Sequence, residues 1–320
     1  MHRISRRSLI AAAAASLALP ARGRAQAQPW VPQRPIQIIV GFAPGGASDI
    51  LARGMAQASQ EFVPVPIVVV NRPGAAGVLA AQQVAAAPGD GTQLLVTGGS
   101  ESTSVPHYRE VSYHPLRDFR HVVLAARYPL ILCVKGDGPI RSIGDLIERA
   151  KAAPGRVTFG SSGVASLYQS VFVVLGKRAG VEMLHVPYTG GAPALTAAAA
   201  GQVDVTVATP DECKGLVEAG TLRPIAVASR RRAREYPEVP TLIESGFDVY
   251  MENLKGLSVP ATTPDPIYEY LAGIFRRGLE TPVWQSFAQR AGVTTANIDG
   301  AGFTRAIQEM SDAIAAAVKG

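Results

Sequence analysis

Short runs of β-branched residues alternate with longer Ala-rich segments along most of the sequence. In the first long segment Ile50, Leu51, Met55, Ala58 and Phe62 recur with helical period, so they fall on one helical face. Strand-length runs that alternate with such helices are typical of parallel sheets with helical crossovers. The sequence therefore predicts an α/β fold built from parallel sheets.

Two such series follow one another along the chain. The first predicts strands at 35–40, 66–70 and 92–97 and helices at 49–62 and 75–87. The second predicts helices at 143–152, 167–178, 192–200 and 212–219 and strands at 157–159, 183–186, 203–208 and 222–228. Helices at 266–278, 284–291 and 303–318 end the chain, and we expect them to pack back on the first series.

The length of the chain suits two domains of ordinary size. We expect domain I to comprise residues 28–128 and 248–320, and domain II to comprise residues 129–247. The first crossing is expected at Arg127-Tyr128-Pro129, and the return between Ser229 and Val259. Two α/β domains joined in this way place a cleft where the carboxyl ends of their strands meet.

The first 27 residues have the features of an export signal. Ser5-Arg6-Arg7 precedes an apolar run that is too short to span a bilayer, and Ala25-Gln26-Ala27 is a small-residue cleavage site. The paired arginines favour a twin-arginine signal over an ordinary secretory one. Both routes place the mature chain outside the cytoplasm, and we expect it to be soluble because no later apolar run is long enough to cross a membrane.

The charge distribution gives no support to nucleic-acid binding. The formal net charge of +6 comes from 31 basic and 25 acidic residues. Five of the arginines, and no acidic residue, lie within the first 27 residues, which leaves a net charge of about +1 for the rest. The basic run from Arg230 to Arg234 has no aromatic residues within it and is interpreted as a solvated face.

The sharpest local feature is the glycine-rich turn from Gly41 to Asp49, which joins a strand to a helix. Such a turn points backbone N–H groups outward beside the positive end of a helix dipole, and so it can bind an anion. Ala47 stands where a phosphate-binding loop needs lysine, and the dinucleotide fingerprint is also absent. The alternative is a structural turn in which Ser48 or Asp49 caps the helix.

Two similar turns occur in the second series, at residues 159–166 and 186–193. Each joins a strand to a helix and offers N–H groups and small hydroxyl groups. Singly these turns are weak signals, because turns are commonly rich in Gly and Ser. Three of them at strand ends of two facing domains form a stronger pattern.

No catalytic or metal-binding constellation accompanies these turns. Gly160-Ser161-Ser162-Gly163 lacks the spacing of a nucleophile elbow. His107, His114 and His121 recur every seven residues, but prolines interrupt any common helix, so neither a metal nor another cofactor is predicted. The two cysteines, Cys133 and Cys213, could form one bridge, although Cys133 lies in an apolar run and is interpreted as a buried thiol.

Several motifs occur in order over nearly the whole chain after the export signal. They are Phe42-Ala43-Pro44-Gly45-Gly46-Ala47-Ser48-Asp49, Asn71-Arg72-Pro73-Gly74, Gly89-Asp90-Gly91, Phe159-Gly160-Ser161, His185-Val186-Pro187-Tyr188, Gly201-Gln202-Val203-Asp204 and Glu244-Ser245-Gly246. Together they resemble the Bug family, the TctC-like substrate-binding proteins of tripartite tricarboxylate transporters. The resemblance implies a type II-like periplasmic-binding-protein fold with its ligand cleft between two parallel-sheet domains.

The resemblance also implies how a small carboxylate would be held. In that family the contacts come largely from main-chain groups and bridging waters at strand–helix loops of both domains. The predicted ligand-binding residues are Phe42, Ala43, Gly45, Gly46, Ser48, Asp49, Ser100, Ser161, Ser162, Ser166, Tyr188, Gly190, Gly191 and Asp204. Neutral amides at helix starts can hold an anion without arginine, which agrees with the local interpretation.

Three positions bear on the choice of ligand. Thr189 stands where the family often has a basic residue, and Ala165 stands where glycine is usual. Glu101 is expected to face solvent; if it faces the cleft instead, it would hold an ammonium or hydroxyl group.

We therefore expect a periplasmic, monomeric receptor, not an enzyme, that passes a small carboxylate to membrane transporter subunits. The alternatives are a ligand-sensing receptor for a membrane sensor and, less favoured, an exported enzyme on the same fold. An enzyme would need an activated nucleophile or a paired acid and base, and the sequence shows neither.

Overall fold

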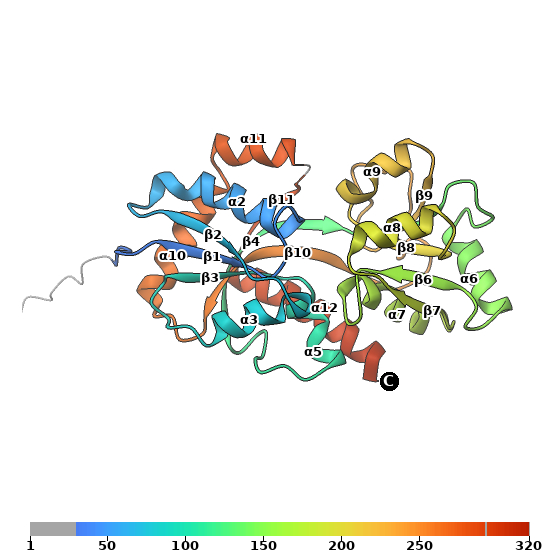
Figure 1. Cartoon of the computed structure of the whole chain (residues 1–320), viewed down its shortest axis with the longest axis horizontal. Helices are drawn as coiled ribbons and strands as arrows, with labels where there is room; N and C mark the ends of the chain where they lie inside the picture. The colour runs from blue at the N-terminus through green and yellow to red at the C-terminus, as the bar shows by residue number, and fades with distance from the viewer. Residues whose placement is uncertain (1–29, 292, 320) are drawn as a thin grey trace, which may run out of the picture. The chain divides into compact units, whose positions relative to one another are not determined.

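A computed structural model describes residues 30–291 and 293–319, so the predicted export signal lies outside the described residues. From Val31 onward the chain forms one compact unit that contains two β-sheets (Figure 1). The expected strands and helices are present with small shifts at their ends, and a short strand at Thr295–Asp299, which the sequence analysis missed, joins the first sheet.

The first sheet has six strands in the order β11-β4-β10-β3-β1-β2. Their bounds are β1 Ile36–Val40, β2 Ile67–Asn71, β3 Gln93–Thr97, β4 Phe119–Pro129, β10 Glu252–Pro260 and β11 Thr295–Asp299. Helices α2 (Ala47–Ser59) and α3 (Val78–Ala85) cover its two faces. Successive side chains of β1 point to opposite sides of the sheet, so β1 contributes apolar residues to both faces. Ile38 packs in the cluster that contains α2, and Ile39 packs in the cluster that contains α3.

The second sheet has five strands in the order β7-β6-β8-β5-β9. Their bounds are β5 Ile131–Lys135, β6 Thr158–Ser161, β7 Leu184–Pro187, β8 Val205–Ala208 and β9 Leu222–Val227. The helices between them are α6 (Ile143–Ala152), α7 (Leu167–Ala179), α8 (Gly191–Ala199) and α9 (Pro210–Glu218). Only short helices, α4 (Ser100–Thr103) and α5 (Val105–Tyr108), interrupt the irregular stretch that precedes β4.

Each sheet is mixed rather than parallel, which corrects one detail of the predicted fold. Strands β1–β3 and β6–β8 pair in parallel, whereas β10 and β5 are antiparallel to their neighbours. Only Leu130 separates β4 from β5, so the chain leaves the first sheet at its carboxyl edge and enters the second sheet at the corresponding edge. A strand that enters there must run against the others, and β10 does the same on its return to the first sheet.

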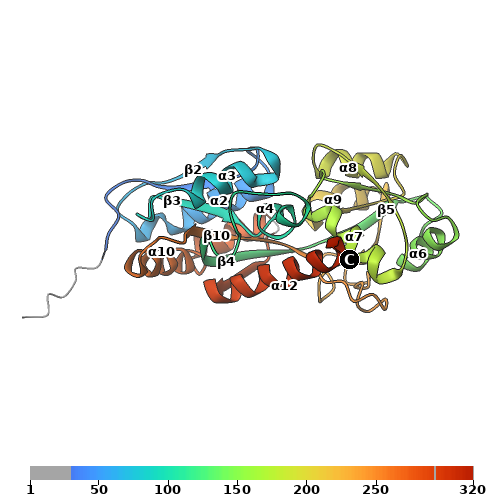
Figure 2. The same cartoon turned by 90° about the horizontal axis from the view of Figure 1, so that it is seen from below.

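The carboxyl-terminal helices pack more widely than expected. Helices α10 (Asp265–Gly278) and α11 (Pro282–Arg290) pack on the first sheet, as predicted. The last helix, α12 (Gly300–Lys319), begins against β4 and extends to α7 of the second sheet (Figure 2). Phe303 and Met310 pack beside the first sheet, whereas Ile314 belongs to the core of the second. This helix therefore ties the two sheets together. Within the described residues no helix is both long and apolar enough to cross a membrane.

The helix starts follow the expected capping rules. Ser142 caps α6 and forms a capping box with Asp145: the Ser142 hydroxyl accepts from the Asp145 N–H at 3.1 Å, and the Asp145 carboxylate accepts from the Ser142 N–H at 3.1 Å. Ser166 caps α7 by accepting from the Gln169 N–H at 3.1 Å. By contrast, Gly46 and Gly190, which precede α2 and α8, provide no side-chain cap.

A buried histidine in the first sheet makes the stability of the fold depend on pH. His121 is 4% exposed, its Nδ1 lies 2.7 Å from the Ser258 hydroxyl, and burial lowers its pKa to about 4. Between about pH 6.5 and 4 the unfolded chain binds a proton at this residue and the folded chain does not. Above about pH 6.5 the ionisation of His121 therefore costs no stability. As the pH falls through that range, His121 lowers the free energy of unfolding by up to about 1.4 kcal/mol per pH unit.

We expect His121→Gln to flatten this part of the acid profile relative to the wild type. The measurement is the free energy of unfolding by urea at intervals between pH 7 and 4, compared as slopes so that a constant loss of stability in the variant does not matter. Parallel profiles for the two proteins would show that His121 is protonated equally in the folded and unfolded chains.

Candidate functional site: a cavity between the two sheets

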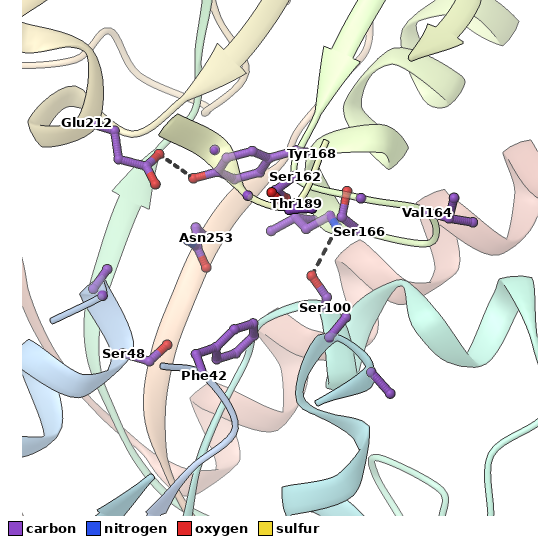
Figure 3. A pocket seen from close by; sticks show the side chains of 18 of the residues that line it. Phe42, Ser48, Ser100, Ser162, Val164, Ser166, Tyr168, Thr189, Glu212 and Asn253 are labelled. Carbon is purple, nitrogen blue, oxygen red and sulfur yellow. Dashed lines mark hydrogen bonds between the residues drawn. The ribbon is translucent and has the colours of Figure 1, made fainter. Parts of the chain in front are cut away.

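A cavity of about 450 Å³ lies between the carboxyl edges of the two sheets (Figure 3). It is lined from the first sheet's side by residues of the β1–α2 loop, the segment before α3, and α4, and from the second sheet's side by the loops before α7 and α8 and by the start of α9. Strand β10 contributes Asn253 and Lys255. This volume is within the range of sites for small organic ligands.

The amino-terminal ends of α2 and α8 face the cavity without side-chain caps. Gly46, Ala47 and Ser48 line it at the start of α2, and Gly190 and Gly191 line it at the start of α8. The first N–H groups of a helix have no acceptor within the helix, and the helix dipole makes this end positive. These two ends therefore present hydrogen-bond donors and a partial positive charge to the cavity.

The start of α7 also lines the cavity and is bonded across to the first sheet's side. The Leu167 N–H donates to the Ser100 hydroxyl at 3.1 Å (Figure 3). The Ser104 hydroxyl donates to the carbonyl oxygen of Ala165 at 2.8 Å. Ser100 and Ser104 thus hold the loop before α7 against α4.

Ala165 adopts a backbone conformation that favours glycine. Its φ is 62°, in the left-handed region, where a residue with a Cβ is strained and glycine is not. Ala75 and Ala76, which line the cavity before α3, have φ values of 51° and 56°. Loops in such conformations occur often at ligand sites, where the surrounding structure holds them in place.

An acidic group occupies the wall on the second sheet's side. Glu212 Oε2 accepts from the Tyr168 hydroxyl at 2.6 Å (Figure 3). It also accepts from the Thr209 N–H at 2.9 Å. Burial, together with the nearby Glu212 carboxylate, raises the pKa of Tyr168, so its hydroxyl remains a donor. Both Tyr168 and Glu212 line the cavity, and a Cβ on Gly191 would stand 3.0 Å from Glu212 Oε1.

Two basic side chains line the cavity on the first sheet's side. Lys255 is 5% exposed, and its Nζ lies 5.3 Å from the centroid of the Phe42 ring. Arg109 donates to the carbonyl oxygen of Ala75 at 2.7 Å and so braces the loop before α3. Two basic side chains therefore line the cavity in addition to the helix ends.

The cavity brings together residues from all three of the predicted turns. Eight of the predicted binding residues line it: Phe42, Gly46, Ser48, Ser100, Ser162, Ser166, Gly190 and Gly191. Ala43, Gly45, Asp49, Ser161, Tyr188 and Asp204 are not among its lining residues. Thr189, the predicted departure from a basic residue, does line it.

Asp49 lies behind the β1–α2 loop and organises it. Its carboxylate accepts from the Gly45 N–H at 2.9 Å, from Arg53 at 2.9 and 3.0 Å and from Asn71 Nδ2 at 2.9 Å. Burial raises the pKa of Asp49, but these hydrogen bonds outweigh burial and hold it below its usual value. Gly45 has a φ of 83°, which only glycine adopts without strain. Asp49 and Gly45 therefore determine the conformation of the β1–α2 loop.

Ser161 and Tyr188 stand one step behind the loop that precedes α7. The Ser161 hydroxyl donates to the Gly163 carbonyl at 3.0 Å and accepts from the Gly163 N–H at 3.2 Å. The Tyr188 N–H donates to the carbonyl oxygen of Ser161 at 3.0 Å. Both residues therefore shape a loop whose neighbours, Ser162 and Gly163, line the cavity.

Asp204 lies at the opposite edge of the second sheet. It precedes β8, and its Oδ2 accepts from the N–H and the hydroxyl of Thr158, the first residue of β6. The cavity lies where these parallel strands end, so a residue that precedes β8 is one strand length away from it. Asp204 thus joins the beginnings of two strands.

The charged residues of the cavity were not among the predicted binding residues. Lys255, Glu212 and Arg109 lie in segments that carried no motif, and so do Tyr168 and Asn253. Glu101, which was expected to face solvent, is 2% exposed, so that expectation was wrong. The only available signal was a charged residue within an apolar run, as at Lys255 in β10.

The cysteines and histidines do not form a metal centre in the part of the chain that the structure describes. His107 lies 2.7 Å from the Ser311 hydroxyl, and His121 contacts Ser258. Cys133 and Cys213 are both buried free thiols of one hydrophobic cluster, as the apolar context of Cys133 predicted.

Two sheets with covering helices and a cavity between their carboxyl edges are typical of two-lobed solute receptors. Comparison with known proteins agrees. The sequence matches the tripartite tricarboxylate transporter family receptor, TctC, over residues 51–319. A UPF0065 protein from the gbd 5′ region of Cupriavidus necator is 33% identical over 277 residues, which cover 86% of this chain and 84% of that protein. The chain therefore belongs to the TctC family, which confirms the family membership that the sequence motifs indicated.

Solved structures of similar proteins include two with bound carboxylates. Rpa4515 of R. palustris, solved with adipate, is 28% identical with a TM-score of 0.77, and the match covers 90% of this chain and 98% of that one. MatC (Rpa3494) from Rhodopseudomonas palustris, solved with malate, is 25% identical with a TM-score of 0.78, and the match covers 90% and 99%. These likenesses confirm the two-sheet binding-protein fold.

Proposed function

We propose that this protein is an extracytoplasmic solute receptor that binds a small carboxylate in the cavity between its sheets and delivers it to a tripartite tricarboxylate-type transporter. The observation that carries this proposal is the convergence of the uncapped amino-terminal ends of α2 and α8 on one cavity of about 450 Å³. These ends come from both sheets, so one anion can contact both at once.

Family membership and the two carboxylate-bound neighbours support the same function. The predicted export signal supports a periplasmic location, and we propose that the mature chain is a monomer. Binding would stabilise the arrangement in which both sheets contact the ligand, and the membrane subunits would recognise that state. This role requires no reaction, and we propose that the protein is not an enzyme.

A thermal-shift screen tests the carboxylate. At 100 times its dissociation constant, a ligand that binds only the folded protein stabilises it by about 2.7 kcal/mol, which corresponds to a rise of roughly 5 °C or more in the melting temperature. We expect at least one mono-, di- or tricarboxylate to give this rise and the corresponding amides to give none. A rise with neutral or cationic compounds only would contradict the proposal.

Native mass spectrometry of protein purified separately from the periplasmic and the cytoplasmic fractions adds a second measurement. The mass of the denatured chain reports whether residues 1–27 are removed, and the mass of the native chain reports an acid that has remained bound. A full-length chain found only in the cytoplasm would contradict the proposed location.

A further inference from the structure

Lys255 is a buried cation that faces the cavity without an ion-pair partner. It is 5% exposed, and among residues 30–291 and 293–319 no carboxylate forms a direct salt bridge with it. Burial lowers its pKa, and the nearby carboxylates of Glu101 and Glu212 oppose this effect. A buried ammonium group is costly unless its donors find acceptors, so the cavity side of Lys255 is suited to an anion.

Glu101 lies near Lys255 but accepts no hydrogen bond from the Lys255 ammonium group among the described residues. Glu101 Oε1 accepts from the Gly99 N–H at 3.0 Å and from the Ser102 hydroxyl at 2.9 Å. Its Oε2 is buried and has no hydrogen-bond partner in the described part of the chain. One oxygen of this carboxylate is therefore held in place, and the other remains unpartnered.

The distance between the Glu101 carboxylate and the Lys255 ammonium group can be bounded from their positions around Gly99. A Cβ on Gly99 would stand 3.0 Å from Glu101 Oε2 and 3.0 Å from Lys255 Nζ, so the two atoms lie at most twice that distance apart. Among the described residues, these two groups nevertheless form no direct salt bridge. Attraction to Glu101 favours the charged form of Lys255, while the ammonium N–H groups stay available to a ligand.

Glu212 presents an acceptor from the second sheet's side. Its Oε2 accepts two hydrogen bonds, from Tyr168 and Thr209, whereas the structure assigns no donor to its Oε1 within the described residues. Glu212 also interacts electrostatically with Lys255. The cavity therefore offers a cationic donor and an anionic acceptor within electrostatic range of each other.

We propose that Lys255 binds the carboxylate of the ligand directly and that Glu212 Oε1 accepts a hydrogen bond from a hydroxyl or ammonium group of the same molecule. The ligand class is then a hydroxy- or amino-substituted carboxylic acid. This inference rests on the proposed carboxylate-receptor function and narrows it. A second carboxylate beside Glu212 would be repelled, whereas a donor there completes the set of hydrogen bonds.

The local geometry of β10 places the Lys255 side chain at the cavity. The pairing of β10 with β4 shifts register between Lys255 and Gly256, and such irregularities re-aim side chains at sheet edges. Because β10 enters the first sheet at its carboxyl edge, its early residues Asn253 and Lys255 reach the cavity.

The test compares acids that differ in one substituent. Succinate, malate and aspartate form one set, benzoate and 2-hydroxybenzoate form another, and succinamide is the neutral control. Titration calorimetry measures each dissociation constant for the wild type, for Lys255→Met and for Glu212→Gln. Lys214→Met is the matched control, since Lys214 is an exposed lysine of α9. Because Lys255→Met leaves Glu101 unbalanced, the double variant Lys255→Met/Glu101→Gln is measured beside it.

We expect the wild type to bind a substituted acid about tenfold more tightly than its unsubstituted partner. Lys255→Met and the double variant should weaken every acid at least about 30-fold, and Lys214→Met should change affinity less than about twofold. Glu212→Gln should reduce the preference for the substituted acid. Equal affinities of wild type and a folded Lys255 variant would overturn this inference and leave the receptor function intact. Equal binding of substituted and unsubstituted acids would overturn the role of Glu212. Binding of none of the acids would overturn both proposals.

Discussion

Gly46→Leu should abolish ligand binding while the protein remains folded. Gly46 precedes α2 with a φ of −80°, which any residue can adopt, and a Cβ there would meet only the Ala43 carbonyl oxygen, at 3.6 Å. A leucine therefore fits the backbone, but its side chain would cover the first N–H groups of α2. Loss of two hydrogen bonds to a charged ligand, at about 2 kcal/mol each, weakens binding at least about 1,000-fold.

The control for this variant is Gly273→Leu. Gly273 lies on the exposed side of α10, and nothing stands within 4 Å of an added Cβ. Calorimetry with the carboxylate found by thermal shift should give wild-type affinity for Gly273→Leu and no detectable heat for Gly46→Leu. Circular dichroism and the melting temperature report whether each variant is folded. A folded Gly46→Leu protein with wild-type affinity would place the binding site away from the start of α2.

Gly256→Ala should destabilise the protein severely. A Cβ at this buried position of β10 would overlap the carbonyl oxygen of Val123 on the paired strand β4 and the ring of Phe303 on α12. The backbone oxygen cannot move without breaking the pairing of the two strands. We expect a loss of about 3 kcal/mol or more, seen as a fall of roughly 10 °C in the melting temperature.

Gly273→Ala is the matched control for this substitution. It adds the same methyl group at an exposed helical position, where alanine stabilises a helix by roughly 0.5–1 kcal/mol relative to glycine. We therefore expect opposite effects from two glycine-to-alanine substitutions. A melting temperature unchanged by Gly256→Ala would mean that β4, β10 and α12 are packed less closely than the structure shows.

Local patterns in the sequence were sufficient for most of the elements, although not for β11, and for the glycine-rich loops that line the cavity. The turns at Gly46, Ser162 and Gly190 were predicted because a strand, a glycine-rich turn and a helix start are contiguous in the chain. Parallel strands with helical crossovers place such turns at one edge of a sheet, so their convergence follows from the topology. Family motifs along the chain then indicated a carboxylate receptor, and family membership is confirmed.

The direction of strands could not be predicted in the same way. An apolar run such as β5 or β10 has the same pattern whether it runs parallel or antiparallel to its neighbours. The strands that cross between the sheets are antiparallel because they enter at the carboxyl edge. The same limit applies to Asp204: its motif was recognised, but its position at the beginning of β8 places it at the far edge of the sheet.

The sequence by itself determined most of the α/β elements, the glycine-rich turns and the family, because each depends on residues that are neighbours in the chain. Only the tertiary structure decided the charges of the cavity. Lys255, Glu101 and Glu212 lie on three segments that are distant in sequence, and the crossing strands bring them together. The cavity that the predicted glycine-rich turns line therefore also contains a buried lysine, whose effect depends on distance and burial rather than on any local pattern.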